Sequence, residues 1–176
     1  MIIRSFRGAS PRIADSALIA DNVYIIGDVE IGENCSIWPN VVIRGDTSGV
    51  RIGNNVHIED GSVLHTFTEL EDNVMIGHGC LVEGPVGTRS MIANGASVMP
   101  RAKVGRYCTI GAGAVVLGGH EIPDRTFATG TPARKRAEID PDDPEDRHYS
   151  EYYTRYMDNM VLEYKKEGIW SRGGSW

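Results

Sequence analysis

The chain has 176 residues, enough for one domain with a sizeable core, and its 21 glycines suit a fold with many tight corners. A net charge of −6 argues against a nucleic-acid partner, and no apolar run approaches the roughly 20 residues of a membrane span. The opening segment MIIRSFRGAS is too short and too polar for a secretory signal. We therefore expect a cytoplasmic protein that binds neither nucleic acid nor membrane.

Residues 1–23 are expected to form one strand and an irregular coil. After them, an aliphatic residue returns at every sixth position. Neither a helix, with period 3.6, nor a half-buried strand, with period 2, produces a period of six, whereas a short strand and a turn repeated around a three-sided coil does. The positions are Ile25, Ile31, Ile37, Ile43, Ile52, Ile58, Leu64, Leu70, Ile76, Val82, Val86, Ile92, Val98, Val104, Ile110, Val116 and Ile122.

Small or β-branched side chains fill the fifth place of each hexad, two residues before the next aliphatic, and we expect them to point inward as well. Cys35, Cys80 and Cys108 all fall in this place without CxxC spacing, which predicts packed thiols in a reducing compartment. The sequence thus predicts an all-β fold: a single-stranded, left-handed parallel β-helix of hexapeptide repeats, followed by a C-terminal α-helix.

The end of the chain divides into three predicted parts after a β-helix domain over residues 1–137. An acidic linker containing DPDDPED covers 138–149, a helix covers 150–168 and a flexible tail covers 169–176. The helix is expected to pack through residues that recur at spacings of three and four, on a prism face or on a neighbouring chain. These residues are Tyr149, Tyr152, Tyr153, Tyr156, Met160 and Tyr164.

Three hexads make one turn of the coil, so the register assigns each aliphatic residue to a face. Ile43, Leu64, Val82 and Val98 stack on face one. Ile52, Leu70 and Val86 stack on face two, and Ile58, Ile76 and Ile92 on face three. Two hexads are irregular: three extra residues near 46–49 are expected to bulge outward, and the step from 82 to 86 is two residues short.

Register also positions the histidines. His65 and Glu83 are 18 residues apart, so they are expected to stack in adjacent rungs and to point outward, with Arg44 one rung below His65. His78 follows Ile76 on face three and cannot easily share a ligand with His65 in one chain. A threefold trimer places face one of one prism against face three of the next, and would create three equivalent metal sites between subunits.

Two readings of these residues remain open at this point. Two imidazoles and one carboxylate form a legitimate zinc set, with a position left for a water molecule whose pKa can fall to about 7. Alternatively, the histidines only form hydrogen bonds at a packed interface, and Glu83 pairs with a basic neighbour. His148, in the acidic linker, and His120, in an inward place near the end of the prism, are expected to be structural.

The segment VVIRGDTSGVRIGNNVHIEDGSVLH, followed by MIGHGCLVEG, resembles the γ-class carbonic anhydrases and their homologues. The resemblance covers about residues 10–137, and GTPARKRAEI is similar to the family's exit from the prism into its C-terminal helix. It implies a homotrimer of left-handed β-helices that holds zinc, or iron in some members, between subunits.

Carried over residue by residue, the resemblance implies that His65 and His78 are metal ligands and that Glu83 stands where the family has a third histidine. Arg44 and Asp46 match its interface arginine and aspartate. The family motif of asparagine, isoleucine, glutamine and aspartate here reads His57, Ile58, Glu59, Asp60, so that Glu59 replaces the glutamine that orients the metal-bound water.

Three functions follow as hypotheses. The first is a metal-dependent enzyme related to carbonic anhydrase that acts weakly on carbon dioxide or on another small carbonyl substrate, with Glu59 as a general base. The second is a non-catalytic trimeric scaffold. The third is an acyltransferase that uses acyl-coenzyme A, because that class shares the same coil, although a shared fold alone is weak support.

Overall fold

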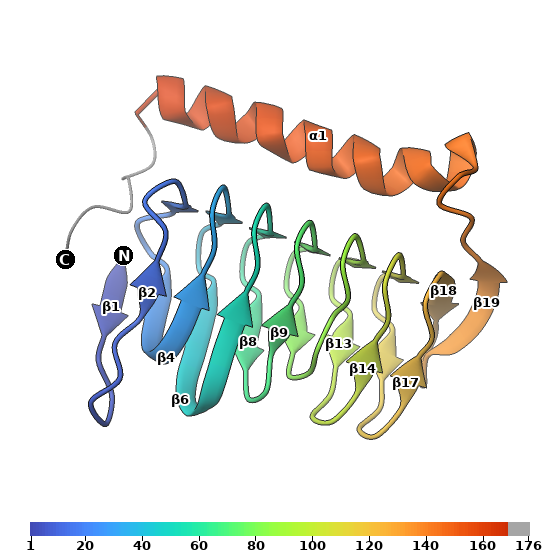
Figure 1. Cartoon of the computed structure of the whole chain (residues 1–176), viewed down its shortest axis with the longest axis horizontal. Helices are drawn as coiled ribbons and strands as arrows, with labels where there is room; N and C mark the ends of the chain where they lie inside the picture. The colour runs from blue at the N-terminus through green and yellow to red at the C-terminus, as the bar shows by residue number, and fades with distance from the viewer. Residues whose placement is uncertain (169–176) are drawn as a thin grey trace.

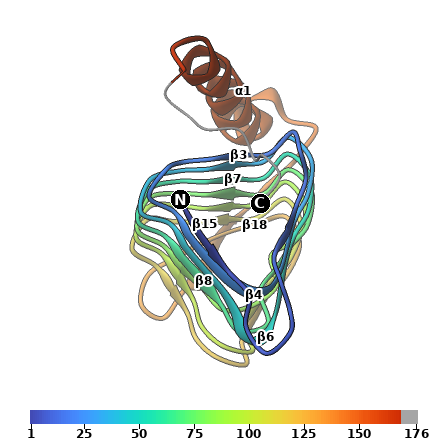
Figure 2. The same ribbon diagram turned by 90° about the vertical axis from the view of Figure 1, so that its left-hand side faces the viewer.

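The chain folds as a three-sided, left-handed β-helix with one long helix against a side, as predicted (Figures 1 and 2). The computed structural model describes residues 1–168, and for 144–154 it describes the backbone alone. The predicted tail, 169–176, lies outside the described residues. No helix in the described part of the chain is long and apolar enough to cross a membrane.

The strands form three sheets, with successive coils pairing in parallel. The largest contains β1 (Ile2–Arg4), β2 (Arg12–Ile13), β4 (Tyr24–Ile31), β6 (Val42–Ile52), β8 (Val63–His65), β9 (Glu69–Leu70), β11 (Leu81–Val82), β13 (Ser97–Val98) and β16 (Val115–Val116). The second contains β3 (Leu18–Ile19), β5 (Ser36–Ile37), β7 (His57–Ile58), β10 (Met75–Ile76), β12 (Met91–Ile92), β15 (Thr109–Ile110), β18 (Thr126–Thr129) and β19 (Arg134–Glu138). The third pairs β14 (Lys103–Val104) with β17 (Glu121–Ile122).

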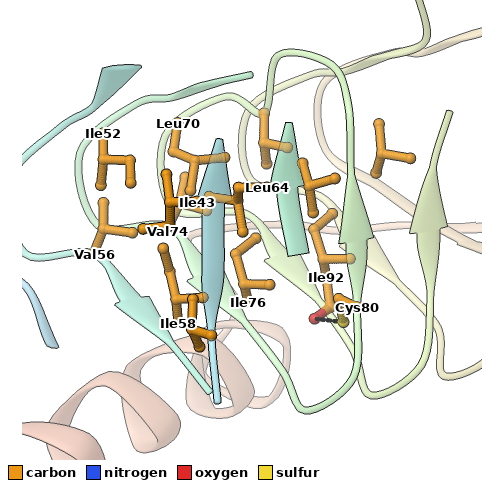
Figure 3. Close-up of a cluster of buried hydrophobic side chains, with 14 of the residues drawn as sticks. Ile43, Ile52, Val56, Ile58, Leu64, Leu70, Val74, Ile76, Cys80 and Ile92 are labelled. Carbon is orange, nitrogen blue, oxygen red and sulfur yellow. Dashed lines mark hydrogen bonds between the residues drawn. The ribbon is translucent and has the colours of Figure 1, made fainter. Parts of the chain in front are cut away.

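The pairing register confirms the predicted faces. Leu64 pairs with Ile43 and Val82 on face one, and Ile76 pairs with Ile58 and Ile92 on face three. The repeated aliphatic residues form the interior of the prism (Figure 3). All three cysteines are free and buried in the predicted fifth place, and burial raises the pKa of Cys35 and Cys80 to about 11, so these thiols are inert packing groups.

Corners between faces use left-handed backbone, which asparagine and glycine adopt most readily. Asn34, Asn55 and Asn73 have φ values of 56°, 54° and 61°, and Gly79 has a φ of 63°. Gly79 directly follows His78, so the corner glycine fixes where that histidine leaves the coil. Any other residue at 79 would be strained.

Helix α1 (Pro144–Lys166) returns along the whole prism and lies over face three (Figures 1 and 2). It begins six residues earlier than predicted, because proline is favoured at the first helical position and acidic residues, here at 145 and 146, are favoured in the first turn. The acidic stretch therefore belongs partly to the helix. The residues that follow the last hexad form β18 and β19, which pair antiparallel.

The contact stripe of α1 agrees in part with the predicted one. Met160 and Tyr164, both predicted, pack against the prism together with Met157 and Val161, whereas Tyr156 is exposed. Met157, one residue after Tyr156, is buried in its place among Trp38, Met75 and Met91. Trp38 meets Tyr164 edge-on, with ring centroids 5.2 Å apart. The side chains of Tyr149, Tyr152 and Tyr153 lie outside the described residues.

The extra residues at 46–49 form a bulge, as predicted: they lie within strand β6, opposite Asp28 alone, where the pairing register of β6 with β4 shifts. One further expectation needs correction. His120 is exposed instead of inward, since the place that alanine and cysteine fill elsewhere is too small for an imidazole. The side chain of His148 lies outside the described residues.

Candidate functional site

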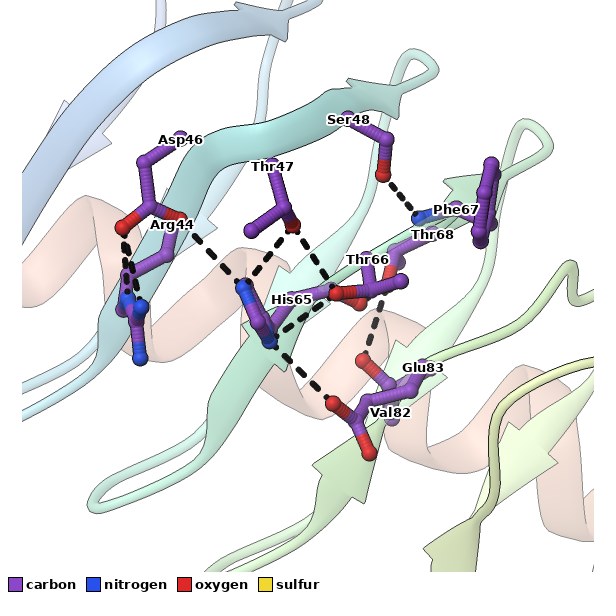
Figure 4. Close-up of polar contacts among 10 residues, drawn as sticks. All are labelled: Arg44, Asp46, Thr47, Ser48, His65, Thr66, Phe67, Thr68, Val82 and Glu83. Carbon is purple, nitrogen blue, oxygen red and sulfur yellow. Dashed lines mark hydrogen bonds and ion pairs between the residues drawn. The ribbon is translucent and has the colours of Figure 1, made fainter. Parts of the chain in front are cut away.

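His65 lies at the end of β8 between two carboxylates, one on each side of its ring (Figure 4). Nδ1 is 3.2 Å from Glu83 Oε1, and Nε2 is 3.3 Å from Asp46 Oδ1. All three side chains are 16–19% exposed, so each still reaches the surface. His65 and Glu83 stack in adjacent rungs, as the 18-residue spacing predicted, and Glu83 turns toward His65. We call Arg44, Asp46, His65 and Glu83 the His65 cluster.

Arg44 fixes the carboxylate of Asp46. Its Nε and Nη2 groups both donate to Asp46 Oδ2, at 3.2 and 2.9 Å, and these hydrogen bonds hold the pKa of the Asp46 carboxyl below its ordinary value. Asp46 Oδ1, in contrast, is buried without a hydrogen-bond partner among the described residues. An ionised oxygen left open beside an imidazole is a place where a proton or a cation is stabilised.

His78 forms a second set, the His78 cluster, with Glu59 and Asp60. Its Nε2 lies 3.3 Å from Glu59 Oε2 and its Nδ1 lies 3.2 Å from Asp60 Oδ2. The His78 side chain is 54% exposed, whereas that of Glu59 is only 11% exposed. Burial raises the pKa of the Glu59 carboxyl above its ordinary value, although the nearby His78 acts in the opposite direction. A raised carboxyl pKa is the direction that a general base needs to operate near neutral pH.

The two clusters do not meet within one chain. His78 precedes strand β11 and Glu83 directly follows it, so the clusters lie at opposite ends of that strand. The described residues contain no group of three histidine, cysteine, aspartate or glutamate side chains that could hold one metal ion. The prediction that His65 and His78 cannot share a ligand in one chain is consistent with this arrangement.

The resemblance places His57 in the same motif as Glu59 and Asp60, but its side chain lies apart from theirs. It is 2% exposed beneath α1, where Nδ1 is 2.7 Å from Ser36 Oγ and Nε2 is 3.5 Å from Asp158 Oδ1. His57 points outward from the middle of face three, where it pairs with Ser36 and Met75 of the adjacent coils. The described contacts of His57 are therefore those of a helix-packing residue.

Other polar groups near the site were not anticipated from the sequence. Thr47 Oγ1 lies 3.1 Å from His65 Nε2, and Thr66 Oγ1 lies 3.0 Å from His65 Nδ1. Asn94 Oδ1 accepts a hydrogen bond from the His78 backbone N–H at 3.1 Å. Thr47 precedes His65 by 18 residues, so the spacing that identified Glu83 also contains the signal for Thr47.

The repeat and the fold define a class of protein, and comparison with known proteins agrees. The family model described as bacterial transferase hexapeptide (six repeats) matches residues 10–45, 49–84 and 86–118. A carbonic anhydrase of Geobacillus kaustophilus is 39% identical over 172 residues, which cover 95% of this chain and 89% of that protein. The chain belongs to the hexapeptide-repeat family, as a γ-carbonic-anhydrase-like member.

Two further relatives show how broad this family is. Gamma carbonic anhydrase 1 from mitochondria of Arabidopsis thaliana is 33% identical over 136 residues, and the match spans 71% of this chain but only half of the plant protein. The crystal structure of a Bacillus cereus protein described as a putative acetyltransferase is 36% identical, with a TM-score of 0.87 over 94% of this chain and 97% of that one. Proteins with similar coils are therefore described both as carbonic anhydrases and as a putative acetyltransferase.

Proposed function

We propose that the protein is a metal-dependent enzyme of the γ-carbonic anhydrase type, acting on carbon dioxide or another small carbonyl compound at a site between subunits of a trimer. The observation that carries the proposal is the direct pairing of His65 with Glu83, the residue that replaces a histidine ligand. The His65 cluster of one subunit would meet the His78 cluster of the next. Three equivalent sites would result.

The donor atoms present suit a zinc or iron ion. Imidazole nitrogen and carboxylate oxygen both bind zinc at about 2.0–2.2 Å, so two ligands of one tetrahedral ion lie about 3.4 Å apart. His65 Nδ1 and Glu83 Oε1 are 3.2 Å apart, which is close to that spacing. His65 and Glu83 would hold the ion from one subunit and His78 from its neighbour.

The carboxylates decide which chemistry is favoured. A bound zinc or iron ion would supply Lewis acidity that lowers the pKa of a water molecule. An anionic ligand such as Glu83 would reduce that acidity relative to a third neutral histidine, so the hydration of carbon dioxide should be slow. The glutamine of the family could only position a water molecule, whereas the carboxylate of Glu59 can accept a proton. This difference favours hydrolysis or proton abstraction from an organic substrate.

Metal content tests the proposal first. Untagged protein purified without oxygen should contain about one zinc or iron ion per chain, and His65→Ala and His78→Ala should each lose it. His120→Ala is the matched control, because His120 is an exposed histidine outside both clusters, and it should retain the metal. Metal-free wild-type protein that remains an intact oligomer would contradict the enzyme and favour a scaffold.

A second candidate is an acyltransferase that uses acyl-coenzyme A. The similarity to the Bacillus cereus protein described as a putative acetyltransferase favours it. Calorimetric titration with coenzyme A separates the two candidates, because an acyltransferase requires binding in the micromolar range and the metal enzyme requires none. Binding that persists in both His65→Ala and His78→Ala would support the acyltransferase.

A further inference from the structure

A cavity of about 570 Å³ lies between α1 and face three. Met75 and Met91, from the middle of the face-three strands, and Met157 and Met160, from α1, supply much of its wall, together with Trp38. Methionine is flexible and polarisable, so a methionine wall adapts to apolar chains of various shapes. Apart from Trp38 and Tyr156, which carry polar atoms, the side chains in this part of the cavity are apolar.

The polar groups of the cavity lie along the edge where the face-three strands end. Glu59, His78 and Asn94 line the cavity there, one or two residues after an inward aliphatic residue. His78 is flanked by two carboxylates, Glu59 and Asp60. An anionic group would be repelled by two carboxylates facing one imidazole, whereas a neutral group with N–H donors and a carbonyl acceptor finds a partner for each.

The volume argues for an occupant larger than carbon dioxide. A water molecule occupies about 30 Å³ in the liquid, so the cavity has the volume of roughly 19 water molecules. Sites for small organic ligands span about 300–1,000 Å³ and combine apolar walls with a few convergent polar groups. The cavity matches that description, and Glu59 and His78 connect it directly to the proposed site.

We propose that this cavity binds a neutral carboxamide with a medium-length alkyl chain, its chain among the four methionines and its amide group at Glu59 and His78. Because it names a substrate class for the proposed enzyme, this inference rests on the proposed function. Hydrolysis of such an amide adds the oxygen of water to the carbonyl carbon, breaks the C–N bond and transfers a proton of water to the nitrogen. The products are a carboxylic acid and ammonia.

Binding is tested by nuclear magnetic resonance of protein labelled with [¹³C]methyl methionine and titrated with hexanamide after metal removal. The methyl signals of Met75, Met91, Met157 and Met160 should shift, while that of Met99, which does not line the cavity, should not. Affinity should rise about fourfold for each added CH₂ from acetamide to hexanamide, since each buried CH₂ contributes about 0.8 kcal/mol. Hexanoate should bind at least about tenfold more weakly than hexanamide, because its charge meets two carboxylates.

Two substitutions fill the cavity from different sides. Ala112→Phe closes it at the exposed edge and Ala93→Leu fills it from face three, and each should weaken hexanamide binding about tenfold or more. Ala137→Phe is the matched control, because Ala137 is an exposed alanine on β19 away from the cavity. Affinity that is independent of chain length, equal binding of hexanoate, or unchanged binding in both filled variants would overturn the inference.

The same titration separates this inference from the proposed function, because binding is measured without metal. Hexanamide binding with no metal in the native protein would support the cavity and contradict the enzyme. One metal ion per chain, with turnover that does not depend on alkyl chain length, would support the enzyme and contradict the cavity as its substrate site.

Discussion

Three residues, His57, Glu59 and Glu83, distinguish this chain from the pattern it resembles, and the last two introduce negative charge. Glu83 contacts His65 and Glu59 contacts His78, so each histidine of the proposed metal set already has a carboxylate beside it. A carboxylate in this position stabilises a bound cation. The two acidic residues lead to separate predictions for catalysis.

Glu83→His restores a third neutral ligand and should raise kcat/KM for carbon dioxide hydration roughly tenfold or more, since a fall of one unit in the pKa of the reactive water is a tenfold change in its ionised fraction. Stopped-flow measurement of proton release at pH 7.5 gives the rate. Glu83→Gln is the control: it removes the charge without supplying an imidazole and should lower metal content. Equal hydration rates in wild type and Glu83→His would contradict the assignment of Glu83 as a metal ligand.

Glu59→Gln should abolish hydrolysis of organic carbonyl substrates while leaving metal content unchanged. The reason is that the amide cannot accept the proton that the buried carboxylate accepts. Ammonia release from hexanamide provides the measurement, with Glu69→Gln as a control at an exposed glutamate on β9. Full hydrolytic activity in Glu59→Gln would remove Glu59 from the mechanism.

Among the structural elements, helix α1 illustrates what sequence could and could not predict. A period of six residues indicates a three-sided coil, so the inward positions of residues such as Ile43, Leu64 and Val82, and the faces they belong to, were predictable. The helix register was predictable only in part: Met160 and Tyr164 pack on the prism as expected, but the sequence does not show that Met157 is buried instead of Tyr156. The burial of His57 was not predictable either, since nothing in the hexads shows which face the helix covers.

His57 makes the attachment of α1 sensitive to pH. Burial lowers the pKa of His57 below its ordinary 6.5, and the more weakly acting Asp158 opposes the shift. The unfolded chain therefore binds more protons than the folded one in the interval between these pKa values, and stability that is fully present above pH 6.5 falls as pH drops through it. The loss cannot exceed about 1.4 kcal/mol for each pH unit between the two pKa values.

Urea unfolding at pH 7.5 and pH 5.0 measures this effect through the free energy of unfolding. The wild type should lose more stability on acidification than His57→Gln, whose side chain can also hydrogen bond with Ser36 but does not titrate. His120→Gln, at an exposed histidine, should retain the wild-type difference. An identical pH dependence in wild type and His57→Gln would show that His57 is protonated as easily in the folded protein as in the unfolded chain.

For the whole molecule, the separation of the two clusters along β11 is the feature with the greatest consequence. One chain carries His65 with Glu83 at one end of the strand and His78 at the other, so the proposed metal site would require two copies. Sequence register predicted this separation, and the same 18-residue spacing relates Asp60 to His78 in the adjacent rung. It does not show that Glu59, one residue before Asp60, also turns toward His78.

Mixed oligomers test the shared site directly. His65→Ala and His78→Ala are each expected to lack metal alone, but when they are unfolded together in equal amounts and refolded, an interface that takes its His65 and its His78 from the two intact sources regains a full set. In a randomly assembled cyclic oligomer, about one quarter of the interfaces combine an intact His65 from one subunit with an intact His78 from its neighbour, because each has a chance of about one half. Metal content should therefore recover to roughly 0.25 of the wild-type value, and mixing without unfolding should give none. No recovery after joint refolding, with oligomers of both types demonstrably mixed by mass spectrometry, would place each metal ion within a single chain.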